Sequence, residues 1–286
     1  MEIEKRRNKK KPESPRISGN KKQLHEAIRQ TGIVKTRLHE KELEIAQLTK
    51  DLSVYAFISS HNLQEPLRNL QFITSLILEK EEKHLSNEGK QYFKRLRKSA
   101  QKIQNLLRDL LEYLNINKEY YKDEPVDLNL ILKDAKKELA EQIHDSKATI
   151  TGKDLCTVNA KPIQIAQLIK DVLSNSIKFA RHGVPPVISL KSKTVKGKKL
   201  KEITKLHYAS FCHIIVKDNG IGFEPHFNER VFNVFEKLHG DSYPGTGIGL
   251  AICKKIVENH GGYITASGAP GAGTIIDIYL PSGPLV

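Results

Sequence analysis

The sequence predicts an α+β protein, in which a helical-hairpin dimerisation domain precedes an α/β sandwich. Two observations lead to this class. Apolar residues recur at spacings close to three and four through much of residues 21–115, the pattern of long amphipathic helices. From about residue 127 onward, helical segments mix with short strand-like segments and glycine-rich turns, which is typical of helices packed on one face of a sheet.

The first half contains the helices of the predicted hairpin. Residues 1–20 have almost no apolar content and two prolines, so we expect a disordered basic tail. The following helical pattern extends to about residue 80, with 21–55 as a helical lead-in or coiled coil; its apolar stripe includes Ile45, Leu48, Leu52, Leu63, Leu67, Leu70, Ile73 and Ile77. "HLSNEG" at 84–89 interrupts the pattern, and a second helix is expected from 88 to 115. One hairpin buries its stripe poorly, so we expect two chains to pair as a dimeric four-helix bundle over residues 56–120.

The second half, residues 121–286, has a mixed pattern of helices and strands that indicates a separate domain. Its expected elements are a helix over 127–144, strands in "ATITGK" and "CTVNA", a helix over 161–180, strands near 186–194 and 211–218, a helix over 246–260, and a terminal hairpin in "YITASGAPGAGTIIDIYLP".

Composition limits the class of protein. A length of 286 residues suits about two domains, and no apolar run approaches the roughly 18 residues of a membrane span. The N-terminus has charge without the apolar core of a secretory signal. The cysteines, Cys156, Cys212 and Cys253, show neither metal spacing nor a disulfide framework, which favours a reducing, cytoplasmic location.

The formal net charge of +14 is concentrated in two short runs. Residues 1–22 carry +6 and residues 191–205 carry another +6, which leaves +2 for the rest of the chain. Such runs are usually solvated tails and loops, and we expect no specific nucleic-acid partner. A basic coiled-coil module that binds polyanions through residues 1–22 stays open as an alternative.

One stretch of the first half, "FISSHNLQEPLRNLQFI" at 57–73, is unusual for a helix. A helix advances about 100° per residue, which places His61 opposite the apolar stripe marked by Leu63 and Leu70, and therefore towards solvent. Pro66 removes a backbone N–H and crowds the preceding turn, so a bend is expected one turn beyond His61. Taken alone, the stretch is compatible with a kinked helix that carries a surface histidine.

Four motifs in the second half favour a functional interpretation. "DVLSNSIKFA" (171–180), "DNGIGF" (218–223), "PGTGIGLAICKKIVENHGG" (244–262) and "GAGTIIDIYLP" (271–281) occur in this order. With residues 57–72 as an H-box, "DVLSNSIKFA" as an N-box, "RVFNVFEKLH" (230–239) as an F-box and three glycine boxes, the chain resembles the sensor histidine kinases of two-component systems. The resemblance covers about residues 50–282 and implies a phosphotransfer bundle followed by a Bergerat-fold ATP-binding domain.

The resemblance implies ATP and Mg²⁺ as cofactors and assigns the site. His61 would attack the γ-phosphate, with Asn62 and Glu65 beside it on the helix. Asp218 would accept the adenine amino group, and Gly220 and Gly222 would let the backbone approach the ring. Asn175 would offer an oxygen to Mg²⁺, and Lys178 would offer a charge to the phosphates. The phosphate tail would be surrounded by a lid and the start of a helix, which contain Gly245, Gly247, Gly249 and Leu250. Thr274 is expected to support Asp218 through water.

Three positions depart from the family pattern. Asn62 replaces the usual carboxylate after the histidine, Glu65 replaces a Thr or Asn that orients water, and Asp171 replaces the Asn that opens the N-box. An ATPase or degenerate kinase that acts as a nucleotide-controlled scaffold is therefore the main alternative. The expected partners of a kinase are a second copy of the chain, a response-regulator receiver domain and a sensory partner protein acting through residues 21–55.

Overall fold

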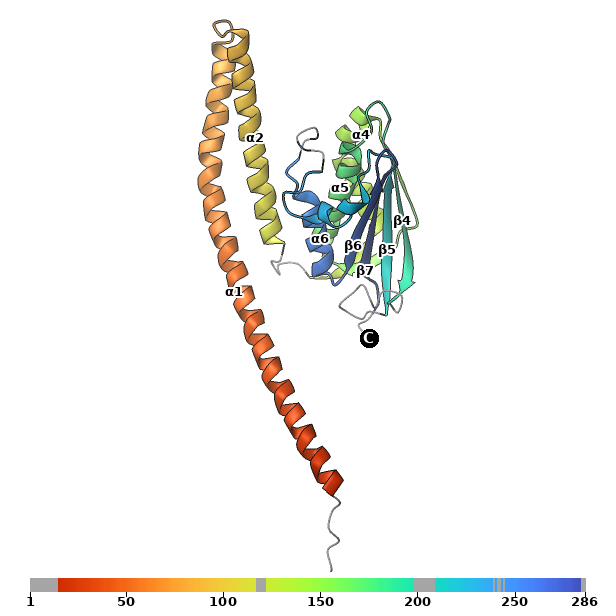
Figure 1. The fold of residues 1–286 in the computed structure, drawn as a ribbon. Helices are drawn as coiled ribbons and strands as arrows, with labels where there is room; N and C mark the ends of the chain where they lie inside the picture. The colour runs from red at the N-terminus through yellow and green to blue at the C-terminus, as the bar shows by residue number, and fades with distance from the viewer. Residues whose placement is uncertain are drawn as a thin grey trace, which may run out of the picture. The chain divides into compact units, whose positions relative to one another are not determined.

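The computed structural model describes the backbone of residues 15–116, 122–197, 209–238, 240, 243 and 245–283, and many side chains between residues 15 and 61 lie outside this description. The chain forms two compact units, residues up to Ala56 and residues Phe57–Val286. The first unit is helical over its described part, and the second contains the helical hairpin and a mixed α/β domain (Figure 1).

Two long helices form the hairpin, as the apolar periodicity predicts. Helix α1 spans Pro15–Lys80 and α2 spans Asn87–Asn115. Ser86 caps α2 by accepting a hydrogen bond from the Gly89 N–H at 3.1 Å, which explains the break in "HLSNEG". The end of α1 runs beside α2, and the Gln71 amide donates to Gln101 at 3.2 Å (Figure 1).

The start of α1 corrects one expectation. Residues 15–20 are helical, although we expected disorder up to residue 20. Pro15 suits the first helical position, where the missing N–H would have no partner in the helix. The expected disorder of residues 1–14 lies outside the described residues. Further along, α1 continues through Pro66.

The second domain is built on a five-stranded sheet in the order β2-β4-β5-β7-β6. These strands are β2 (Thr149–Gly152), β4 (Val187–Lys196), β5 (Ser210–Asp218), β6 (Tyr263–Ala269) and β7 (Gly273–Pro281). The β2–β4 pair is parallel and the other pairs are antiparallel. A separate antiparallel pair joins β1 (Glu124–Asp127) to β3 (Thr157–Ala160), and β1 was not expected from the sequence.

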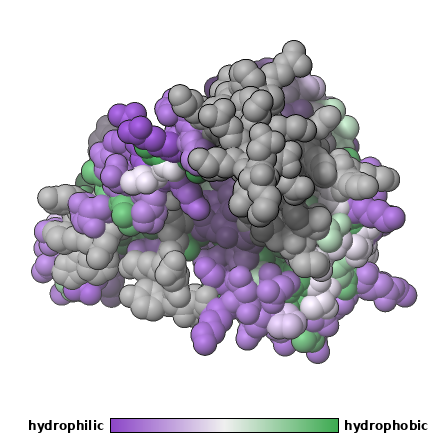
Figure 2. Space-filling view, turned by 90° about the horizontal axis from the view of Figure 1, so that it is seen from below, coloured by the Kyte–Doolittle hydropathy of each residue, from purple (hydrophilic) through white to green (hydrophobic). Residues whose placement is uncertain are grey.

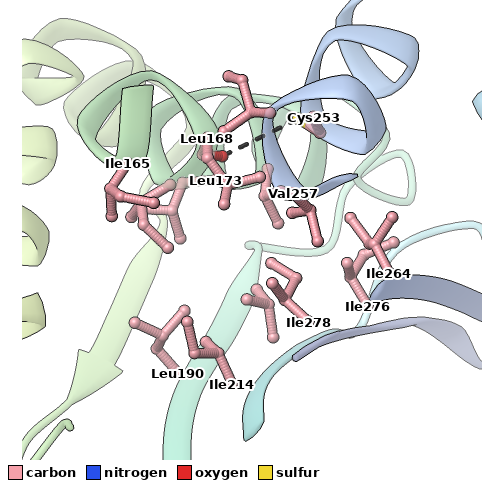
Figure 3. Packing of buried hydrophobic residues seen from close by; sticks show 14 of the residues in the cluster. Ile165, Leu168, Leu173, Leu190, Ile214, Cys253, Val257, Ile264, Ile276 and Ile278 are labelled. Carbon is pink, nitrogen blue, oxygen red and sulfur yellow. Dashed lines mark hydrogen bonds between the residues drawn. The ribbon is translucent and has the colours of Figure 1, made fainter. Parts of the chain in front are cut away.

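Helices cover one face of this sheet, as expected. They are α3 (Leu128–Glu138), α4 (Ala140–Ser146), α5 (Pro162–Lys178) and α6 (Gly249–Asn259). Short 3₁₀ turns lie at Pro225–Phe227 and Arg230–Phe232. Apolar residues of α5 and α6 interdigitate with those of the sheet; Figure 3 shows Ile165 and Leu168 from α5, Val257 from α6, and Ile214 and Ile278 from the strands.

Two helix boundaries differ from the prediction. The helix expected over 127–144 divides at Leu139, whose ψ of 11° leaves the helical range while its side chain is buried in the core. The helix expected from residue 246 begins at Gly249, because Gly247 has a φ of 79° and cannot belong to a right-handed helix. Burial at one position and a left-handed glycine at the other override the local periodicity.

One face of the molecule is mainly polar where the structure describes it (Figure 2). On the face seen in Figure 2, hydrophilic residues predominate and hydrophobic ones are scattered among them. In the described part of the chain, none of the helices is both long and apolar enough to cross a membrane.

Candidate nucleotide site

A cavity of about 300 Å³ lies where α5, the strand end at Asp218 and the glycine-rich loop before α6 meet. Most of the residues predicted to bind nucleotide line it: Asn175, Lys178, Asp218, Gly222, Gly245, Gly247, Gly249, Leu250 and Thr274. These residues come from segments as far apart in sequence as 175 and 274. The fold therefore brings the separate motifs of the second half into one cavity.

Asp218 is buried at the inner wall of the cavity, where three donors hold its carboxylate. Its Oδ1 accepts hydrogen bonds from the backbone N–H groups of Gly220, at 2.8 Å, and Thr274, at 2.9 Å. The Ser176 hydroxyl donates to Oδ2 at 3.2 Å. Burial raises the pKa of Asp218, and the three hydrogen bonds oppose the rise. The carboxylate is therefore fixed in orientation, with Oδ2 the less occupied acceptor.

Thr274 contacts Asp218 directly through its backbone. The expected support through water stays a prediction, and the Thr274 backbone N–H donates to the carboxylate. The geometry that permits this depends on Gly273, whose φ is 89° and whose Cβ would lie 2.1 Å from the Asp218 carbonyl oxygen. Sequence reasoning noted "GAGT" but did not single out Gly273 or Ser176.

The two glycines after Asp218 are packed closely against other backbone segments. A Cβ on Gly222, where φ is 61°, would lie 2.0 Å from the Ala269 carbonyl oxygen. A Cβ on Gly220 would lie 2.6 Å from the Phe179 carbonyl oxygen, and Gly220 does not line the cavity. Close packing of protein backbone therefore requires glycine at both positions, without reference to a ligand.

Lys178 and the glycine-rich loop meet at another part of the cavity wall. The Lys178 Nζ lies 4.3 Å from the centroid of the Phe179 ring, and a Cβ on Gly245 would be 2.8 Å from that nitrogen. Burial lowers the pKa of Lys178, nearby Lys237 lowers it further, and Asp109 and Asp171 oppose the shift. This part of the wall presents a compact cation next to loop backbone, an arrangement that suits an anionic group.

Asn175 is the residue that would offer an oxygen to Mg²⁺. Its side chain lines the cavity one helical turn before Lys178, and its Nδ2 would lie 3.8 Å from a Cβ on Gly249. Among the described residues, no group of three or more His, Cys, Asp and Glu side chains is arranged to hold a metal. A single amide oxygen fits a cation that takes most of its ligands from phosphates and water.

The predicted H-box residues are on helix α1. The His61 backbone lies within α1, and its side chain lies outside the described atoms. The side chains of Asn62 and Glu65 are exposed and do not line the cavity. Asp171 lies outside the lining too; it accepts a hydrogen bond from Gln167 at 2.8 Å, and burial raises its pKa to about 6.

Sequence reasoning missed one side of the cavity altogether. Asn105, Arg108 and Asp109 of α2 line it, together with Phe179 and Tyr243, whose ring centroids are 5.2 Å apart. No local motif marks the α2 residues, because they belong to an ordinary amphipathic helix. The sequence shows only that they share one face of the helix, and the structure shows that this face meets the second domain.

Comparison with known families agrees with this architecture. Residues 58–119 match the family model described as the His Kinase A phospho-acceptor domain, and residues 160–284 match that of the histidine kinase-, DNA gyrase B- and HSP90-like ATPases. The second domain thus has the Bergerat fold. It follows the phospho-acceptor domain along the chain. The chain belongs to the sensor histidine kinases.

Individual relatives support the same family. The chain is 32% identical over 248 residues to the phytochrome-like protein Cph1 of Synechocystis, and 24% identical over 262 residues to the aerobic respiration control sensor ArcB of Escherichia coli. These matches cover 84% and 87% of this chain but only 31% of either relative. The chain therefore spans about a third of the length of these curated relatives.

Solved structures share the fold. Full-length ShkA in complex with AMPPNP is 21% identical, with a TM-score of 0.57 over 81% of this chain and 46% of that one. The Acinetobacter baumannii histidine kinase AdeS is 18% identical, with a TM-score of 0.52 over 78% of this chain and 98% of that one.

Proposed function

We propose that this chain is an ATP-dependent protein-histidine kinase that phosphorylates itself on His61 and passes the phosphoryl group to an aspartate of a response-regulator receiver domain. The observation that carries the proposal is the buried, oriented carboxylate of Asp218 in a cavity that also holds Asn175, Lys178 and the glycine-rich loop. The family supports it, as does ShkA, a protein of the same fold that was solved with AMPPNP.

In this proposal, Asp218 recognises adenine. Its Oδ2 accepts the exocyclic amino N–H, because Oδ1 is already occupied by two backbone donors. Lys178 and the loop that contains Gly245, Gly247 and Gly249 hold the phosphate tail at the start of α6, where backbone N–H groups have no partner within the helix. Asn175 contributes an oxygen to Mg²⁺, which neutralises phosphate charge when bound.

The transfer step forms a nitrogen–phosphorus bond and breaks the bond between the γ-phosphorus and its bridging oxygen, so that ADP leaves. The attacking ring nitrogen of His61 must be neutral, and the other nitrogen carries the proton. Asn62 can accept that proton's hydrogen bond through its amide oxygen and so select the tautomer, although an amide stabilises the developing positive ring less than a carboxylate does. Glu65, one turn further along the helix, adds negative charge on the same face.

A homodimer belongs to the same proposal. The apolar stripe of the hairpin is exposed in the single chain: Leu63 is 48% exposed, Ile73 is 47% exposed and Leu96 is 42% exposed. Pairing with a second hairpin would bury these side chains in a four-helix bundle. A cytoplasmic location also belongs to the proposal, because the reaction consumes ATP and addresses a receiver domain.

Incubation of the full chain with γ-labelled ATP and Mg²⁺ tests the proposal. We expect a phosphoprotein whose label is lost in acid and kept in base, as for a phosphoramidate. The second candidate, a nucleotide-controlled ATPase or scaffold, is favoured by the exposed Asn62 in place of a carboxylate. Release of ADP without any labelled protein would support the second candidate against the first.

A further inference from the structure

Helix α2 belongs to the phospho-acceptor domain, yet it contributes side chains to the lining of the nucleotide cavity. Asn105, Arg108 and Asp109 occupy successive positions on one face of α2, and all three line the cavity. Residues 57–286 form one compact unit, which contains both this helix and the ATP-binding domain. The cavity is therefore made by two domains of the chain.

A hydrogen bond joins the glycine-rich loop to α2. The Thr246 hydroxyl donates to Asp109 Oδ2 at 2.7 Å, and it accepts from the Ile248 N–H at 3.3 Å. Thr246 lies between Gly245 and Gly247, which have φ angles of 142° and 79°. The loop's unusual backbone thus presents the Thr246 hydroxyl to α2.

The position of Arg108 within the cavity follows from these contacts. Asp109, its neighbour, contacts Thr246; Gly245 precedes Thr246 and lies against the Lys178 ammonium. Arg108 therefore adjoins the contact between α2 and the loop as the chain neighbour of Asp109, and it lines the same cavity as Lys178. The buried carboxylate of Asp218, the proposed adenine contact, is a different part of the lining.

The guanidinium of Arg108 is oriented by its own helix. Its Nη2 donates to Asn105 Oδ1 at 3.1 Å, and its Nε lies 3.6 Å from Asp109 Oδ1. The contact with Asn105 is a hydrogen bond that uses one of the five N–H donors of the guanidinium, and the contact with Asp109 is an ion pair. The side chain is 70% exposed, so the head group can still hydrogen-bond to a ligand in the cavity.

The negative charge of a bound nucleotide would require cationic side chains such as this one in the cavity. A triphosphate tail carries several negative charges, and a planar guanidinium suits phosphate oxygens through paired hydrogen bonds. We propose that Arg108 binds the phosphate tail of the nucleotide, and that Asn105 and Asp109 position its guanidinium for this purpose. The inference rests on the proposed function, since it requires that the cavity binds ATP.

Affinities of the full chain for ATP, ADP and adenosine, measured by calorimetry, test the inference. In Arg108→Gln we expect ATP to bind roughly five- to tenfold more weakly, ADP to be affected less, and adenosine to bind as in the wild type. Arg108→Lys keeps the charge without the paired geometry and should recover part of the loss. A merely structural role would lower all three affinities together.

Arg97→Gln is the matched control. Arg97 is exposed, lies eleven residues earlier on the same face of α2, about 16 Å along the helix, and does not line the cavity. It should leave all three affinities unchanged. If the wild type binds ATP and Arg108→Gln binds it equally well, or loses ATP and adenosine alike, the inference is overturned while the proposed function stands. A wild type that binds no ATP overturns the proposed function itself.

Discussion

Replacement of Asp218 by alanine and by asparagine separates its support of the fold from its contact with the nucleotide. The alanine variant removes the acceptor of the Gly220 and Thr274 N–H groups, and each buried donor left without a partner costs about 1–3 kcal/mol. Because water can enter from the cavity, we expect the lower part of the combined range, about 2–4 kcal/mol. For a unit of this size the midpoint of thermal unfolding should fall by roughly 4–16 °C.

The asparagine variant should fold almost normally and still bind ATP poorly. Its amide oxygen can accept from the same two backbone donors, and loss of the buried charge removes the desolvation that raises the pKa of Asp218. Where Oδ2 stood, an NH₂ group would then face the adenine amino group, donor against donor. We expect about 1–3 kcal/mol weaker binding of ATP, which corresponds to roughly 5- to 150-fold.

Differential scanning fluorimetry and calorimetric titration of the two variants provide the test. The reasoning requires a large stability loss in Asp218→Ala, a small one in Asp218→Asn, and weak ATP binding in both. Wild-type affinity in Asp218→Asn would refute the assignment of this carboxylate to adenine, even if the stability effects were as expected.

Three further outcomes are expected. Leu63→Asp should place a charge in the bundle interface and split the dimer in sedimentation, whereas Gln64→Asp, at an exposed neighbour, should not. Asp171→Asn should stabilise the chain at pH 7 by about 1–3 kcal/mol, measured from melting curves of the variant and the wild type. Because the pKa of Asp171 is raised to about 6, the stability contributed by its protonated form is complete below about pH 4 and is lost as the pH rises through 6. Asn62→Asp should accelerate the single-turnover phosphorylation step roughly tenfold without changing ATP affinity, because a carboxylate can assist the attacking imidazole.

Each of these expectations has a result that contradicts it. An unchanged dimer in Leu63→Asp would remove the hairpin stripe from the interface. If the difference in stability between the wild type and Asp171→Asn stayed constant from pH 5 to 8, Asp171 would titrate normally. An equal or slower chemical step in Asn62→Asp would mean that another group assists His61.

The parts of the fold that depend on local pattern could be predicted from the sequence. The periodic apolar stripe gave the hairpin, and the break at Ser86 was visible because a serine cap precedes α2. The division at Leu139 was not visible, because the helical pattern continues across it and burial in the core decides the backbone angle. Strand β1 is four residues long and contains Pro125, so its pairing with β3 left no recognisable signal.

The candidate site shows the same division. Resemblance supplied Asp218, Asn175 and Lys178, and the fold does bring them into one cavity. It could not supply the contact between Asp109 and Thr246, which are 137 residues apart and share no motif. Contacts between domains depend on how two surfaces meet, and no periodic pattern in the sequence predicts them.

The central claim is that His61 accepts the γ-phosphoryl group from nucleotide bound around Asp218. The most direct test is phosphopeptide mass spectrometry under neutral or basic conditions after incubation with Mg·ATP, with the wild type and His61→Gln in parallel and ATP affinity measured for both. The account predicts one phosphohistidine, at position 61, that is absent from the variant while ATP affinity is retained. Undiminished phosphorylation of His61→Gln, or a wild type that binds ATP and carries its phosphate at another residue, would contradict it.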